Sequence, residues 1–95
     1  MIRSFADRET EVIWRGRRSR RLPPEIQAVA LRKLRLLNQA RRLDDLRVPP
    51  GNRLEALRSD RRGQYSIRIN DQWRICFEWP NDSPGPTNVE IVDYH

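Results

Sequence analysis

Alternation of apolar and polar residues near the end of the chain constrains the fold more than any other sequence feature. In the segment YSIRINDQWRICFEW, residues 65–79, every second residue is apolar up to Ile69 and again from Trp73 onwards. A period of two is typical of strands that press one face against a core. The polar residues 70–72 between the two runs include Asn and Asp, which tolerate the left-handed backbone of a tight loop. The segment therefore predicts an antiparallel β-hairpin.

The length of the loop decides which residues of this hairpin face each other. A two-residue loop would place Arg74 opposite Ile67 and mix polar with apolar side chains on both faces of the sheet. A three-residue loop, 70–72, pairs apolar residues with one another and places Arg68 opposite Arg74. The pattern favours the three-residue loop.

Two arginines side by side need an explanation, because like charges directly opposite each other destabilise a sheet by on the order of a few tenths of a kcal/mol. One possibility is structural: a neighbouring carboxylate, from Glu78 or Glu90, neutralises the pair. The other is functional: two converging guanidinium groups suit a phosphate, above all a phosphorane-like transition state that gains negative charge. The sequence leaves both open.

Two helices are predicted before the hairpin. Asp7 is a suitable N-cap for a two-turn helix that ends at Gly16. A long amphipathic helix is expected over residues 25–42, because apolar residues recur there every three or four positions and form one buried stripe: Ile26, Val29, Ala30, Leu34, Leu37 and Ala40.

The remaining segments complete an α+β domain. Residues 2–5 could form a short strand, VPPGN at 48–52 must break the long helix, and NVEIVDYH at 88–95 reads as a third strand. The piece RLEALR, 53–58, suits either a helical turn or a strand. We expect one domain over residues 1–95, with two N-terminal helices packed on one face of a small, mainly antiparallel sheet.

Charge points to a polyanionic partner. The chain carries 19 basic and 13 acidic residues, a formal charge of +6, and every basic residue except Lys33 is arginine. Arginine presents a planar fork that suits phosphate, although a GC-rich genome would also favour arginine over lysine. The run RRSRR, 17–21, is typical of a solvated loop and is a weaker candidate for nucleic-acid binding.

Several classes of protein are disfavoured. Cys76 is the only cysteine and His95 the only histidine, so neither an internal disulfide nor a zinc cluster is expected, and we expect no structural metal and no cofactor. No apolar run has the length of a signal peptide or of a membrane span. The expected location is the cytoplasm, without membrane association.

The last three residues, Asp93, Tyr94 and His95, are the other groups suited to proton chemistry. A terminal histidine is more often a frayed end than a catalytic residue. Strict alternation places Tyr94 on the polar face and its two neighbours on the apolar face. A bulge or a bend would be needed to aim all three at one substrate.

Three segments carry a family resemblance: GNRLEAL at 51–57, GQYSIRINDQWRICFEW at 63–79 and VEIVDYH at 89–95. Together they resemble the HigB toxins, also called plasmid maintenance system killer proteins, of the RelE/ParE superfamily. The resemblance implies a RelE-like, microbial-RNase-like fold. It also implies a type II toxin that cleaves mRNA in the ribosomal A site without a metal, by in-line attack of the ribose 2′-OH on the adjacent phosphate. The implied partners are the 70S ribosome with its mRNA and a HigA-like helix-turn-helix antitoxin.

The resemblance also implies roles for individual residues. Arg74 would stabilise charge on the scissile phosphate and Arg58 would be a second phosphate ligand. Arg68 and Arg53 would bind the RNA backbone. Asp93 would orient His95, the general acid or base, and Tyr94 would stack on a base or assist proton transfer. Some HigB proteins carry a second histidine where this chain has Glu55, so that Glu55 either takes the second proton-transfer role or leaves most of the rate to electrostatics, which is the reading we prefer.

Two other functions fit the same sequence. One is a non-catalytic RNA-binding or ribosome-binding module in which the arginines only hold phosphates. The other is a ParE-like gyrase poison, which shares the fold and has no need for the Asp93-Tyr94-His95 ending.

Overall fold

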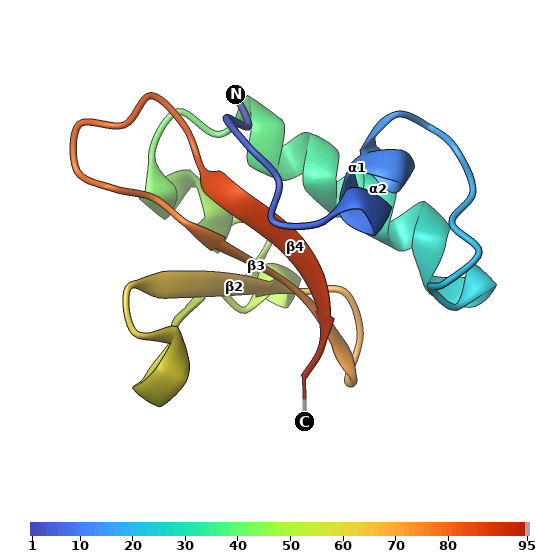
Figure 1. The fold of residues 1–95 in the computed structure, drawn as a ribbon. Helices are drawn as coiled ribbons and strands as arrows, with labels where there is room; N and C mark the ends of the chain where they lie inside the picture. Colours follow the sequence, from blue (N-terminus) through green and yellow to red (C-terminus); the bar gives the residue numbers. More distant parts are fainter. Residues whose placement is uncertain (95) are drawn as a thin grey trace.

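The helices and strands follow one another in the order that the sequence pattern indicates (Figure 1). The computed structural model describes residues 1–94. Two helices come first, and strands and short 3-10 turns fill the second half: α1 (Arg8–Trp14), α2 (Pro24–Gln39), η1 (Leu43–Arg47), η2 (Pro50–Asn52), β1 (Glu55–Ala56), η3 (Ser59–Arg61), β2 (Gln64–Arg68), β3 (Trp73–Glu78) and β4 (Thr87–Asp93). The predicted α+β class is confirmed.

The sheet has the order β1-β2-β3-β4, and each neighbouring pair is antiparallel. In the hairpin Ile67 lies opposite Ile75 and Arg68 opposite Arg74, so the predicted register is confirmed. Its loop is closed by the Asn70 side chain, whose oxygen accepts hydrogen bonds of 2.8 Å from the backbone N–H groups of Gln72 and Trp73. The side-chain oxygen of Asn70 thus accepts hydrogen bonds that a backbone carbonyl would otherwise accept in a turn.

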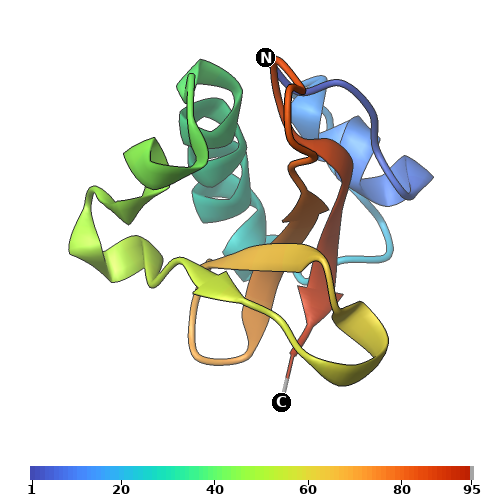
Figure 2. The ribbon, with the colours of Figure 1, turned by 90° about the vertical axis from the view of Figure 1, so that its left-hand side faces the viewer.

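One core lies between the helices and the inner face of the sheet. Its members come from alternate positions of the hairpin and β4, from the apolar stripe of α2 with Ala40 after it, from α1 and from η1: Ile13, Ile26, Ala30, Leu34, Leu37, Ala40, Leu46, Ile67, Ile69, Ile75, Phe77, Val89 and Ile91. In Figure 2 both helices occupy the upper part of the molecule, whereas η3 and the end of β4 lie below. None of the helices in the described part of the chain is long and apolar enough to cross a membrane.

Two segments differ from the sequence-based expectation, and a third segment, which the sequence left ambiguous, is resolved by the structure. Helix α2 ends at Gln39 rather than at residue 42, because the N–H groups of Arg41 and Arg42 bind the Asp45 carboxylate instead of continuing the helix. Residues 2–5 do not form a strand; only Phe5 makes an isolated parallel bridge, to Val89. The ambiguous segment 53–58 contains the two-residue strand β1, which pairs with β2 at the edge of the sheet.

Helix α1 begins where the sequence predicts. The Asp7 carboxylate accepts a hydrogen bond of 2.9 Å from the N–H of Thr10, as an N-cap should. Thr10 is buried, and its hydroxyl in turn accepts from the N–H of Ile91 in β4 at 2.9 Å. Gly16 follows the helix with φ of +81°, the left-handed conformation that ends many helices. The short first helix is therefore bonded directly to the last strand.

Candidate active site

A groove lies between β1, the start of η3 and the end of β4. It has a volume of about 740 Å³, and it is lined by residues from these three segments: Glu55, Ala56, Leu57, Arg58, Ser59 and Tyr94. Glu55 lies opposite Ser66, and Ser66 lies opposite Cys76, so these three residues form one row on the outer face of the sheet. The groove combines a cation, a carboxylate and an aromatic ring.

Arg74 is held beside the groove by three groups. One terminal nitrogen donates to the Ser66 hydroxyl at 3.2 Å, and the other lies 3.4 Å from a carboxylate oxygen of Glu55. The guanidinium carbon lies 5.3 Å from the centre of the Tyr94 ring, within the range of a cation–π contact. Only 14% of the Arg74 side chain is exposed. The position of this charge is therefore fixed before any ligand binds.

The end of β4 determines where Tyr94 lies. The strand ends at Asp93, and the N–H of Tyr94 then donates to the carbonyl of Gln72 in the hairpin loop at 2.7 Å. Asp93 is opposite Trp73 on the inner-face side, and its carboxylate accepts from the Gln72 side chain at 3.0 Å. Alternation thus separates Asp93 from Tyr94 as the sequence predicts. His95, the third member of the predicted group, lies outside the described residues.

The predicted phosphate ligands fall into two clusters. Arg58 lines the groove, and Arg74 lies beside it in contact with Glu55. Arg68 instead forms an ion pair with Asp71 in the hairpin loop. This hydrogen bond lowers the pKa of Asp71, and the positive charge of Arg53 lowers it further. Arg68 and Arg74 therefore lie opposite each other in the sheet but pair with different carboxylates.

The structural alternative named Glu78 or Glu90 as the carboxylate beside Arg68 and Arg74, and the structure gives this place to two other carboxylates. Glu90 pairs with Arg61 at 2.8 Å, which also raises the pKa of Arg61, and Glu78 accepts from the Asn88 side chain. The carboxylates of Asp71 and Glu55 take their place. Glu78 and Glu90 are candidates in the sequence because they belong to the same face of the sheet as Arg68 and Arg74. In the structure, however, η3 brings Arg61 to Glu90, and β1 brings Glu55 to Arg74.

Sequence reasoning missed Ser66 as a ligand of Arg74. Ser66 is fully buried, although it belongs to the polar face of β2, and its hydroxyl is an acceptor for the guanidinium. The sequence could have indicated this contact. Ser66 is two positions before Arg68, so it lies diagonally across from Arg74 in the predicted register. Arg61 carried no such signal, because its position depends on the 3-10 turn.

Lys33 is a second group that the sequence gave no reason to single out. It is buried within α2, and its ammonium donates to the Asn52 side chain, which is also fully buried. Asn52 uses its own amide to donate to the carbonyls of Leu46 and Val48. Burial lowers the pKa of Lys33, and the nearby charges of Arg32 and Arg68 lower it further. This pair fixes the segment that leads into β1.

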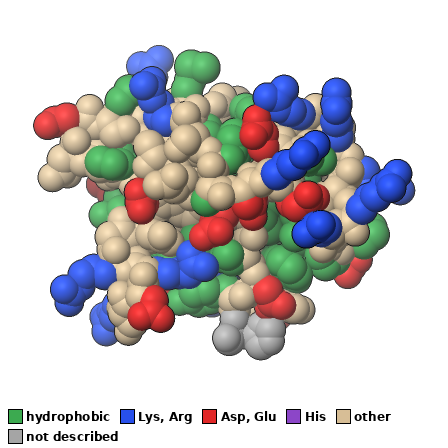
Figure 3. Space-filling view, viewed as in Figure 1, with side chains coloured by type: hydrophobic (Ala, Val, Ile, Leu, Met, Phe, Trp, Pro, Cys, Tyr) green, Lys and Arg blue, Asp and Glu red, His purple; other side chains and the backbone are tan. Residues whose placement is uncertain are grey.

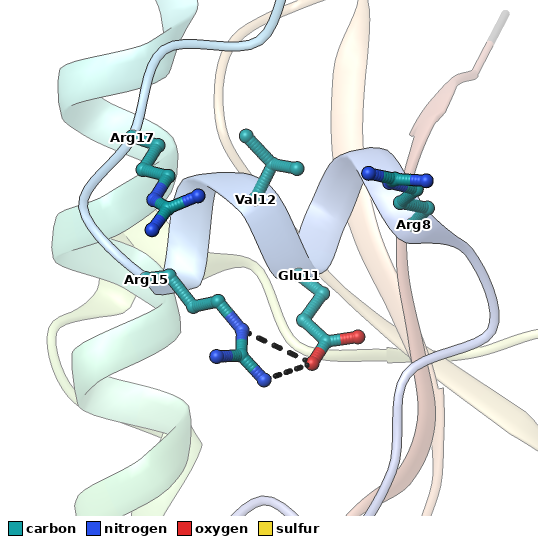
Figure 4. Close-up of a pocket in the computed structure, with 5 residues that line it drawn as sticks. All are labelled: Arg8, Glu11, Val12, Arg15 and Arg17. Carbon is teal, nitrogen blue, oxygen red and sulfur yellow. Dashed lines mark hydrogen bonds and ion pairs between the residues drawn. The ribbon is translucent and has the colours of Figure 1, made fainter.

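A different hollow lies on the outer side of α1 (Figure 4). Arg15 is bound to Glu11 there at 2.8 Å, Arg17 lies beside them, and Arg8 lies towards the other end of the helix. Basic side chains gather over this end of the molecule with acidic ones among them (Figure 3). This hollow contains none of the predicted site residues.

The run RRSRR after α1 is more ordered than a solvated loop would be. Ser19 is buried, and its hydroxyl donates to Glu9 at 2.6 Å and accepts from the N–H groups of Arg21 and Leu22. Gln27 of α2 bonds to the backbone of Ser19 in both directions. The four arginines of the run are all exposed around this anchor.

Metal ligands are scarce at these sites. Over residues 1–94, no three His, Cys, Asp or Glu side chains are grouped so that they could hold a metal ion.

Comparison with known proteins agrees with this architecture. Residues 3–95 match the sequence model of a family described as the RelE-like toxin of type II toxin-antitoxin system HigB. Toxin HigB-1 of Vibrio cholerae serotype O1 is 40% identical over 80 residues, which cover 83% of this chain and 84% of the relative. An uncharacterized protein of Haemophilus influenzae is 34% identical over 75 residues, or 79% of this chain and 74% of the relative.

Proposed function

Because the chain belongs to the HigB-like family of RelE-like toxins from type II toxin-antitoxin systems, we propose that it is a ribosome-dependent mRNA endonuclease. A toxin of such a system has an antitoxin partner, and we propose a HigA-like helix-turn-helix protein in this role. We further propose that the substrate is mRNA in the A site of the 70S ribosome. The toxin acts in the bacterial cytoplasm.

The observation that carries this proposal is the fixed guanidinium of Arg74 beside a groove that also presents Arg58 and Tyr94. Cleavage by the ribose 2′-OH forms a phosphorane-like transition state with more negative charge than the ground state. A preorganised cation stabilises that charge without reorganising during the reaction. Arg74 takes this role, and the exposed Arg58 binds a second phosphate oxygen.

The other residues serve the substrate and its protons. Tyr94 presents an exposed aromatic ring on which an unstacked mRNA base packs. His95 protonates the leaving 5′-oxygen, and Asp93 orients it. Arg68 and Arg53, beside the hairpin loop, hold the RNA backbone. The nucleophile is the substrate's own hydroxyl, so the reaction as proposed proceeds without a metal-bound water.

A cleavage assay on programmed ribosomes tests the proposal. Purified toxin is expected to cut mRNA in the A site and to leave free RNA largely intact, because the ribosome supplies part of the alignment. Arg74→Ala should slow cleavage by about 10²–10³-fold. Arg47→Ala is the matched control, since Arg47 is exposed and its ion pair with Asp44 lies on the surface.

The same assay separates the competing functions. His95→Gln should abolish cleavage and toxicity while ribosome association, measured by sedimentation, persists. Binding without cleavage by the parent protein would instead identify a non-catalytic ribosome-binding module. Intact mRNA together with altered DNA supercoiling would identify a gyrase poison. Rapid cutting of free RNA would contradict the dependence on the ribosome.

A further inference from the structure

The turn at residues 58–63, which contains η3, presents Arg58 to the groove but has no apolar anchor of its own. Within this turn Arg61 alone is partly buried, and the other five residues are exposed. The last buried side chain before the turn is that of Leu57, whose N–H donates to the carbonyl of Gln64 at 2.9 Å and closes the base of the loop. Apolar packing therefore does not decide where the turn lies.

The backbone of the turn adopts a conformation that local bonds support only weakly. The N–H groups of Arg61 and Arg62 donate to the carbonyls of Arg58 and Ser59 at 3.2 and 3.1 Å. Ser59 has φ of +57°, in the left-handed region that a residue with a side chain adopts at a cost in free energy. Such a conformation persists where contacts from outside the turn hold it in place.

The Arg61 side chain supplies those contacts. One of its terminal nitrogens donates to the Gln64 side chain at 3.0 Å and to the carboxylate of Glu90 in β4 at 2.8 Å. Within residues 1–94, these are the only hydrogen bonds or ion pairs that join residues 58–62 to the rest of the protein. The Arg61 side chain is 34% exposed and that of Glu90 24%, so water screens this pair less than an ion pair on the open surface.

The geometry favours a positioning role for Arg61 over direct binding of RNA. Arg61 does not line the groove, and a phosphate could reach its bonded nitrogen only by displacing Glu90. Arg58 is exposed in the groove, and among the described residues no carboxylate lies within ion-pair distance of it. Arg58 is therefore the cation of this turn that is free to bind a ligand.

Arg58 and Arg61 are linked through the backbone of the turn, because the carbonyl of one accepts from the N–H of the other. A displacement of about 1 Å at a reacting centre can slow an enzyme by about 10²-fold. We propose that the ion pair between Arg61 and Glu90 is a positioning device, which fixes the turn against β4 and so holds Arg58 where the scissile phosphate binds. This inference rests on the proposed function.

Single-turnover cleavage of mRNA on ribosomes, with toxin at saturating concentration, tests the proposal. Arg61→Gln and Glu90→Gln weaken the pair from either side, and each should slow cleavage by about 10-fold while ribosome association, measured by sedimentation, changes little. Arg61→Lys keeps the charge without the planar fork and should recover part of the rate. Arg62→Gln removes the same charge from the neighbouring exposed position and is the matched control.

A double-mutant cycle identifies the residue through which the pair acts. In an Arg58→Ala background, Arg61→Gln should slow cleavage by less than about 2-fold further, because the side chain to be positioned is gone. In an Arg74→Ala background, Arg61→Gln should keep its full effect, since Arg74 is held by other partners.

Amide hydrogen exchange on the toxin without ribosomes reports on the turn itself. The N–H groups of Arg61 and Arg62 should exchange faster in Glu90→Gln than in the parent, whereas those of β2 and β3 stay protected, and thermal unfolding checks that each variant is folded. The inference is wrong if their exchange is unchanged or if folded Glu90→Gln cleaves as fast as the parent.

It is equally wrong if Arg61→Gln loses the same factor with and without Arg58. A parent protein that leaves ribosome-bound mRNA intact overturns the proposed function instead. The exchange experiment does not depend on cleavage, so it still decides whether the pair holds the turn, and the two failures are distinguishable.

Discussion

At the scale of single residues, the outer face of the sheet combines buried and charged groups in one row. Glu55, Ser66, Cys76 and Glu90 lie opposite one another across the four strands. The middle two are fully buried, although alternation assigned them to the polar face. The covering groups are long side chains, above all Arg74 and Arg61, which lie over the strands and pair with Glu55 and Glu90. Charged residues here shield part of the sheet from water.

The Cys76 thiol should make folding sensitive to alkaline pH. Burial raises its pKa to about 11 from an ordinary value of 9.0, because the thiolate loses its hydration in the folded protein. A folded-state pKa above the unfolded one means that the contribution to stability is complete below pH 9 and is lost as the pH rises towards 11. At about 1.4 kcal/mol per pKa unit, the loss amounts to roughly 2–3 kcal/mol. Urea unfolding between pH 8 and pH 11 measures it.

Cys76→Ala provides the control for this titration, because other groups also titrate above pH 9. The variant lacks the thiol, so its free energy of unfolding should fall less steeply over the same range. If the free energy of unfolding fell equally steeply with pH in the parent and in Cys76→Ala, the loss of stability would not come from the Cys76 thiol.

Asn52 is expected to be one of the most sensitive positions for stability. Asn52→Ala removes two donors to the carbonyls of Leu46 and Val48 and leaves the buried ammonium of Lys33 without its acceptor. Unsatisfied buried polar and charged groups each cost about 1–3 kcal/mol, so the free energy of unfolding should fall by roughly 2–4 kcal/mol. Urea denaturation measures the change. Asn81→Ala, at an exposed turn, should change stability by less than about 0.5 kcal/mol, and equal effects would refute this account.

At the scale of elements, the connection between α1 and α2 behaves as a structured segment. Ser19→Ala should lower the free energy of unfolding by about 1–2 kcal/mol, because Glu9 and two backbone N–H groups lose their buried partner. Chemical denaturation measures this, with Gln39→Ala at the exposed end of α2 as the control. If both variants unfold at the same denaturant concentration as the parent, the connection is as loose as a solvated loop.

The β-hairpin was the element best predicted from sequence. Its register follows from the alternation of apolar and polar residues, a pattern that can be read from neighbours two positions apart. A slip by one residue would turn the apolar side chains of one strand towards water. The extent of α2 was predicted less well. Its stripe of apolar residues continues to Ala40, but the helix stops at Gln39. The Asp45 carboxylate accepts hydrogen bonds from the N–H groups of Arg41 and Arg42, four and three residues before it, and so competes with the helix for them.

At the scale of the whole molecule, net charge should govern association with RNA. A protein of charge +6 that contacts phosphates releases counterions on binding. We expect the proposed association with ribosomes to weaken by about 10-fold or more when the salt concentration rises from 50 to 200 mM, as measured by sedimentation at several salt concentrations. Affinity that does not change with salt would rule out phosphate contacts as its main source.

The sequence by itself determined the α+β class, the hairpin register, the facing pair Arg68 and Arg74, and the separation of Asp93 from Tyr94. These depend on local periodicity. Tertiary structure alone decided which carboxylates meet Arg74 and Arg61. Glu55 reaches Arg74 from the edge strand β1, and Tyr94 reaches it from the end of β4, at the opposite edge of the sheet. No periodic pattern encodes a contact between residues so far apart in the chain, because such a contact depends on how the sheet and its connections bring them together.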